Sequence, residues 1–130
     1  MTSEPPHILV LEDDAKYQNV VVFNLTHAGF KVTVASESSV ALTLAENNHF
    51  DLVIVAYYLP DCPGTNFIRL LREDDVHRHV PVILLTACGV KLDEKYLREE
   101  LAVLLMSKPR SMVELVDTVA ESLAIVQGTS

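Results

Sequence analysis

Short continuous apolar runs alternate along this chain with stretches whose apolar residues recur every three to four positions. A continuous run is typical of a strand that is covered on both faces, and the three-to-four spacing is typical of a helix. The runs predict strands at 7–11, 52–55, 82–85 and 103–106, and 30–34 is predicted as a strand between Gly29 and the segment 35–36. The periodic stretches predict helices at 15–28, 38–48, around 67–71, at 92–100 and from 111 onward. Strands and helices that alternate five times predict an α/β fold, (βα)5, with a parallel sheet between two layers of helices.

Turn and cap signals support these boundaries. Gly29 stands where the first helix should end, and Ser38 or Ser39 is expected to cap the second helix. Two prolines and a glycine make 59–64 a loop, and the Ser-x-x-Glu pattern at 111–114 predicts a capping box for the last helix.

Composition narrows the function classes. With 130 residues and 49% hydrophobic content, we expect a single domain over 1–130 with its core at about 7–126. The net charge of -8 disfavours binding to nucleic acid or to an anionic membrane, and no apolar run approaches the ~20 residues that span a bilayer. Cys62 and Cys88 are expected to be free thiols in a reducing cytosol, so we predict a cytoplasmic protein.

Polar residues with phosphate chemistry follow several predicted strands. Ligands of parallel α/β sheets bind beyond the carboxyl ends of the strands, where these residues should meet. Clustered carboxylates such as Glu12 and Asp13 need a cation, and their oxygens suit Mg²⁺. The hydroxyl of Thr86 and the ammonium of Lys108 suit phosphoryl oxygens, while the third strand ends in Ala56. The edge therefore predicts an Mg²⁺-dependent phosphoryl site without a nucleophile.

Each of these residues also has an ordinary structural explanation. Asp13 or Asp14 could cap the first helix, Thr86 could be a strand-end hydroxyl, and Lys108 could be a surface lysine. Their joint placement at one edge favours the functional interpretation. His77 and His79 are expected to be solvated loop residues and not metal ligands.

Four segments resemble receiver domains of two-component response regulators, including chemotaxis-type single-domain receivers. They are ILVLEDD (8–14), DLVIVAYYLPDCPG (51–64), PVILLTA (81–87) and SKP (107–109). Their order, content and spacing carry the resemblance over nearly the whole chain. It implies a flavodoxin-like doubly wound fold with five parallel strands in the order 2-1-3-4-5.

The resemblance also assigns roles at the edge. It implies that Glu12, Asp13 and the backbone carbonyl of Tyr58 hold Mg²⁺. The phosphate-accepting aspartate of the family would stand at Ala56. Since a methyl group has no lone pair, we expect phosphoryl transfer there to be blocked and Mg²⁺ to bind weakly.

The remaining implied roles concern the phosphoryl group and its readout. Thr86 and Lys108 would contact the phosphoryl oxygens. The implied donors are a histidine kinase or a histidine phosphotransfer protein. Downstream effectors would read the face formed by the fourth helix, fifth strand and fifth helix, with Ala87 and Leu105 as switch or interface positions. The family commonly has an aromatic residue at Leu105, and we favour a plain buried strand residue there. Such a domain is a signalling receiver and not an enzyme.

Two interpretations of Ala56 stay open. The chain could be a natural pseudo-receiver that binds partners regardless of phosphate, or an ordinary receiver with a substituted or recently lost aspartate. The presence of Glu12, Asp13, Thr86 and Lys108 favours the second. A nucleotide-binding enzyme on the same architecture is discarded, because the acidic segment after the first strand would repel phosphate.

Overall fold

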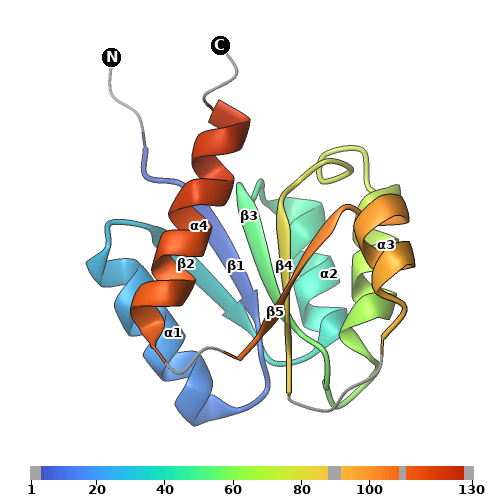
Figure 1. Cartoon of the computed structure of the whole chain (residues 1–130), viewed down its shortest axis with the longest axis horizontal. Coiled ribbons are helices and arrows are strands. Elements are labelled where there is room, and N and C mark those ends of the chain that lie inside the picture. The colour runs from blue at the N-terminus through green and yellow to red at the C-terminus, as the bar shows by residue number, and fades with distance from the viewer. Residues whose placement is uncertain (1–3, 88–91, 109–110, 128–130) are drawn as a thin grey trace.

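A computed structural model describes residues 4–87, 92–108 and 111–127, and it contains a five-stranded parallel sheet (Figure 1). The strand order is β2-β1-β3-β4-β5, as the resemblance to receiver domains implied. The strands are β1 His7–Leu11, β2 Lys31–Ala35, β3 Leu52–Ala56, β4 Val82–Thr86 and β5 Val103–Ser107. Each lies within one or two residues of its predicted position.

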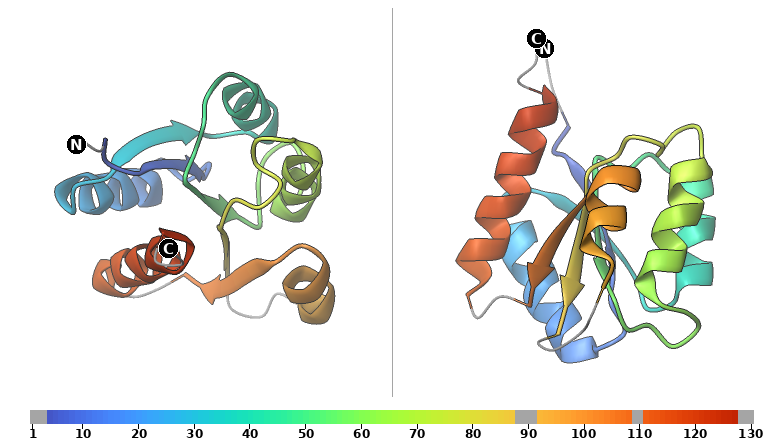
Figure 2. Two further views of the ribbon diagram at one scale, coloured as in Figure 1. Left: turned by 90° about the horizontal axis from the view of Figure 1, so that it is seen from above. Right: turned by 45° about the vertical axis from the view of Figure 1, so that its right-hand side comes forward.

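Helices cover both faces of this sheet (Figure 2). The helical elements are α1 Ala15–His27, α2 Ser38–Asn47, α3 Gly64–Glu73, the π-helix η1 Tyr96–Glu100 and α4 Met112–Gln127. Helices α1 and α4 pack over one apolar cluster, whereas α2, α3 and η1 pack over another. Within the described ranges, no helix is both long and apolar enough to cross a bilayer.

β1, β3 and β4 are almost entirely apolar because each serves both clusters, whereas β2 contains Lys31 and Thr33. In β1, Ile8 and Val10 join the cluster under α1 and α4, while Leu9 and Leu11 join the cluster under α2 and α3. Successive side chains of a strand point to opposite faces, so a sheet covered on both sides needs an unbroken apolar run. This is the reason that the run, and not an alternating pattern, marked these strands in the sequence.

The helix caps agree with the sequence only in part. Asp14 is the N-cap of α1, and its carboxylate accepts hydrogen bonds from the first turn of that helix. Gly29 follows α1 with a φ of 100°, a left-handed conformation that favours glycine. The prediction that Ser38 or Ser39 caps α2 was wrong. Their backbone N–H groups donate to the two carboxylate oxygens of Asp61, at 3.0 and 3.1 Å, so the cap comes from the β3–α3 loop.

The fourth helix is shorter than the predicted 92–100. Its regular part is the five-residue π-helix η1, in which only Leu97 is buried. Ala102, just before β5, has a φ of 52°, which a residue with a Cβ rarely adopts. With one buried apolar residue, this segment has little packing energy to hold a longer regular helix.

The expectation that His77 is a solvated loop residue was wrong. Its side chain is fully buried, with Nδ1 2.6 Å from Oδ2 of Asp74. Its Nε2 accepts a hydrogen bond of 3.1 Å from the backbone N–H of Phe50. Because Nε2 accepts, Nδ1 carries the proton and donates to the carboxylate. The imidazole therefore joins the loop before β4 to the loop before β3, at the sheet edge opposite the predicted phosphoryl site.

Candidate functional site

The carboxyl ends of the five parallel strands form one edge of the sheet (Figure 1). The pairing fixes which residues meet there: Ala56 lies beside Leu85, and Thr86 lies beside Ser107. The backbone N–H of Lys108 donates to the carbonyl of Thr86 at 2.9 Å, which extends the β4–β5 ladder by one residue. The register thus brings the ends of β3, β4 and β5 together, as the sequence predicted.

An ion pair joins this edge to the end of β1. Nζ of Lys108 lies 3.0 Å from Oε1 of Glu12, whose side chain is only 3% exposed. The other oxygen, Oε2, accepts a hydrogen bond of 3.0 Å from the backbone N–H of Asp14. No described donor reaches Oε1 with hydrogen-bond geometry, so Lys108 neutralises this oxygen as a neighbouring charge. A buried carboxylate without a cation is costly, and the ammonium meets that need here.

The ring of Tyr17 lies beside the same ammonium. Nζ of Lys108 lies 4.4 Å from the centre of the Tyr17 ring, within the range of a cation–π contact. The Tyr17 hydroxyl is buried and has no hydrogen-bond partner among the described residues. Burial, and secondarily the charge of Glu12, raise the pKa of Tyr17 to about 12, so the ring stays neutral. No local pattern in the sequence pairs Tyr17 with Lys108.

The start of α3 packs closely against the end of β3 at Ala56. The backbone N–H of Tyr57 donates to Leu85 at 3.0 Å, and that of Gly64 returns to the Tyr57 carbonyl at 2.7 Å. A Cβ at Gly64 would lie 2.2 Å from the carbonyl oxygen of Ala56, which is closer than atoms can approach. Glycine is therefore required for α3 to begin directly against the end of β3. The sequence indicated a loop there but not this contact.

The two tyrosines after β3 lie in different surroundings. Tyr57 is half-buried and packs against the cluster under α2 and α3, whereas Tyr58 is 64% exposed at the rim. Their rings meet edge to face at 4.9 Å. Asp13 is also exposed at this edge. Of the predicted metal ligands, the structure thus buries Glu12 and leaves Asp13 and Tyr58 open to solvent.

The positions expected to transmit a signal lie on β4 and β5. Thr86 is half-buried at the end of β4, and Ala87 after it is exposed. Leu105 is half-buried and packs against the cluster under α2 and α3. Leu105 is thus a strand residue as expected, but it is half-buried and not fully buried. Cys62 is a free thiol that donates to the Ser38 hydroxyl at 3.1 Å, whereas the predicted free thiol at Cys88 lies outside the described residues.

The donor set at the edge suits a cation but is incomplete for a metal. Oε1 of Glu12 is a buried oxygen without a hydrogen-bond donor, which is a suitable ligand atom for Mg²⁺. Asp13 supplies a second carboxylate, and a methyl group stands at Ala56. Among the residues that the structure describes, no group of three or more His, Cys, Asp or Glu side chains is arranged to hold a metal.

Comparison with known proteins identifies the relatives of this chain. Residues 8–120 match the family described as the response regulator receiver domain. The polar-differentiation response regulator DivK of Brucella anthropi is 28% identical over 115 residues, which is 88% of this chain and 94% of DivK.

Solved structures of a response regulator and of a receiver domain are also similar to this chain. A putative response regulator from Chloroflexus aurantiacus has a TM-score of 0.82 and 27% identity, over 92% of this chain and 98% of that protein. The receiver domain of a Pseudomonas aeruginosa sensor histidine kinase has a TM-score of 0.81 and 26% identity, over 92% and 98% of the two chains. That structure has a magnesium ion coordinated in its active site cleft. The fold, the strand order and the matched residues agree, and the chain belongs to the response regulator receiver domain family.

Proposed function

We propose that this chain is a single receiver domain of a two-component phosphorelay whose phosphorylation is blocked by Ala56. The observation that carries the proposal is the ion pair between Glu12 and Lys108 at the carboxyl edge. A lysine that is 35% exposed and turned onto a buried carboxylate is a charged group available to a phosphoryl oxygen at the same edge. Receiver domains act as signalling modules, and this one acts as a binding partner and not as an enzyme.

Mg²⁺ would be held by Glu12, Asp13 and the backbone carbonyl of Tyr58. When bound, it supplies positive charge that neutralises the oxygens of a transferring phosphoryl group. Ala56 removes one carboxylate from this set, and the remaining ligands bind the metal weakly. The receiver domain of the Pseudomonas aeruginosa kinase, with its bound magnesium ion, supports this placement by similarity.

Ala56 would stop the chemistry because it offers no oxygen to attack phosphorus. Its side chain is 3% exposed at the end of β3, next to Leu85 of β4. Thr86 lies one residue beyond that register, and Lys108 lies two residues beyond Met106, the partner of Leu85. Both would contact the phosphoryl oxygens in a chain that has aspartate at position 56. As it stands, Lys108 keeps Glu12 as its partner, and the domain stays in its unphosphorylated form.

The partners would be a histidine kinase or a histidine phosphotransfer protein upstream and an effector downstream, all in the cytoplasm. The effector would bind the face formed by η1, β5 and α4, which includes Leu105 and adjoins Ala87. Each of these elements exposes a large apolar side chain: Tyr96 by 40%, Leu104 by 46% and Val113 by 68%. Exposed apolar side chains of this size are typical of protein-binding surfaces.

The test is the intact mass of the unaltered chain and of Ala56→Asp after incubation with Mg²⁺ and acetyl phosphate. We expect only Ala56→Asp to gain a phosphoryl group, and we expect hydroxylamine to release it, as it does acyl phosphates. Ala56→Asn is the matched control, because it has nearly the same shape and no nucleophilic carboxylate.

Two results would separate the alternatives. If Ala56→Asp gains no phosphoryl group, the edge is not a receiver site with a single missing residue. The chain would then be a natural pseudo-receiver that binds partners without phosphate. The Glu12–Lys108 ion pair does not separate the two candidates, because it neutralises the edge without any ligand.

A further inference from the structure

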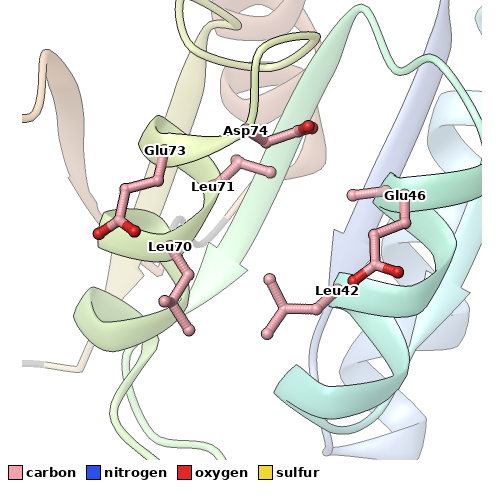
Figure 3. A pocket seen from close by; sticks show the side chains of 7 residues that line it. Leu42, Glu46, Leu70, Leu71, Glu73 and Asp74 are labelled. Carbon is pink, nitrogen blue, oxygen red and sulfur yellow. The ribbon is translucent and has the colours of Figure 1, made fainter.

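An apolar groove rimmed by carboxylates lies between α2 and α3, away from the carboxyl edge of the sheet. Figure 3 shows Leu42 of α2 and Leu70 of α3 pointing toward one another across it. Ala45 and Leu71 complete the apolar lining, and the hollow has a volume of about 300 Å³. Leu70 is 48% exposed although it faces another helix. Two packed helices thus leave part of their apolar surface without a partner.

The charges around this groove have one sign. Glu46, Glu73 and Asp74 line it, and no basic residue does. In Figure 3 the side chains of Glu46 and Asp74 lie on the groove side, whereas Glu73 turns to the outer side of α3. Oδ2 of Asp74 already binds His77 at 2.6 Å, so Glu46 is the carboxylate most available to a ligand.

The basic residues nearest in sequence are turned away from the groove. Helix α2 contains no lysine, arginine or histidine. In α3, Arg69 donates to Asn66 and lines a different hollow beside Tyr57. Arg72 donates to backbone carbonyls of the loop before β4 and of the η1–β5 turn. The negative charge of the groove is therefore not balanced from its own helices.

We propose that the groove between α2 and α3 docks a basic amphipathic helix of a partner protein. An aliphatic side chain of that helix would fill the space between Leu42 and Leu70. Lysine or arginine one turn away would pair with Glu46. Helices commonly bind in grooves through side chains spaced three or four positions apart, which matches an apolar centre with a charged rim. This surface is separate from the face proposed above for effectors.

A second copy of this chain is a poor occupant. The chain has a net charge of -8, so two copies repel at an acidic groove. The helical segment with Lys95 and Arg98 also contains Glu94, Glu99 and Glu100. In α3, Arg69 donates to Asn66 and Arg72 donates to backbone carbonyls. Charge complementarity thus selects a different, basic protein.

The test uses a fluorescent synthetic peptide of about 16 residues, long enough to form a helix, with leucines on one face and lysines beside them. The control peptide has the same composition with the leucines scattered around the helix. Binding is measured by anisotropy, and the site is mapped from amide shifts in NMR spectra. We expect the amphipathic peptide to bind and the shifts to fall on α2 and α3.

Matched variants show whether the groove is responsible. Leu70→Ser and Glu46→Lys should each weaken binding about tenfold, the effect of losing one well-placed contact. Val20→Ser and Glu4→Lys make comparable changes at exposed positions outside both proposed surfaces and should leave affinity within about twofold. All four positions are exposed, and circular dichroism melts check that each variant folds.

The proposal is overturned if the scattered control peptide binds equally well, or if Glu46→Lys binds as tightly as the unaltered chain. It is also overturned if the shifts map to α1 and α4 or to η1 and β5. Concentration-dependent dimerisation that Leu70→Ser abolishes would assign the groove to a second copy instead. None of these outcomes depends on phosphorylation, so they are independent of the acetyl phosphate experiment.

Discussion

Arg72 on α3 holds together three segments that are distant in the sequence, and its replacement should be costly. Nε donates to the carbonyl of Leu101 at 2.8 Å, and Nη1 donates to Val80 at 2.7 Å. Longer bonds of 3.3 Å reach the carbonyls of His77, Arg78 and Ala102. The side chain is half-buried, and burial lowers the pKa of Arg72 from its ordinary value. One side chain thus satisfies carbonyls of the loop before β4 and of the turn before β5.

The size of the loss follows from the two short bonds. Hydrogen bonds to a charged group contribute about 1.5–3 kcal/mol each, and the three long ones contribute less because water can replace them. Arg72→Met keeps most of the aliphatic packing and removes every donor. Since neighbouring bonds are not additive, we expect the free energy of unfolding to fall by about 3 kcal/mol. The free energy of unfolding of a domain is about 5–15 kcal/mol in total, so this loss should lower Tm by about 10 °C.

Urea unfolding followed by circular dichroism measures this difference. Arg69→Met is the matched control, because Arg69 is exposed on the same helix and its described bond goes to Asn66 alone; it should change stability by less than about 0.5 kcal/mol. Arg72→Lys keeps the charge but not the forked donors, and it should lose about half as much as Arg72→Met. A loss below about 1 kcal/mol for Arg72→Met, or equal losses at both arginines, would refute the reasoning.

Three further predictions concern single positions. Gly64→Ala should destabilise the domain by about 1–3 kcal/mol in urea melts, since its Cβ would meet the Ala56 carbonyl at 2.2 Å, and an unchanged midpoint would contradict the need for glycine where α3 begins. In metal-free buffer, Ala56→Asp should melt no higher than the unaltered chain, because it adds a carboxylate near buried Glu12; a clear gain would show that Lys108 neutralises both. Burial, and secondarily Lys31, lower the pKa of His7 below 6.5, so the unfolded chain takes up its proton first and stability should fall as pH drops below about 6.5. His7→Gln should reduce that fall in melts at pH 7.5 and 5.5, and equal falls would exclude His7 as the cause.

The strands were predictable because their signal is local. A parallel sheet that is covered on both faces needs continuous apolar runs, and β1, β3 and β4 supply them. Parallel topology then converts a position in the sequence, the residue after a strand, into a position in space, a common edge. Glu12, Thr86 and Lys108 could therefore be grouped before any contact between them was known.

Contacts between loops were not predictable in the same way. Asp61 caps α2 from the far side of β3, and no local pattern distinguishes it from any loop aspartate. Its N–H donors, chiefly that of Ser38, lower the pKa of the Asp61 carboxyl, a consequence of tertiary structure alone. The prediction for His77 was wrong for a related reason. A histidine in a polar loop is usually solvated, and only the fold brings the Phe50 N–H to its ring.

The buried carboxylate of Glu12 determines where the ammonium of Lys108 lies. Lysine at the end of β5 could have turned to solvent, to Thr86 or to the acidic residues after β1. The structure places its ammonium between the buried Oε1 of Glu12 and the ring of Tyr17, where a carboxylate that is 3% exposed requires a positive charge. A buried anion selects the nearest cation whether or not position 56 carries a carboxylate. The charge balance of this edge therefore does not need an aspartate at Ala56, whereas phosphoryl transfer does.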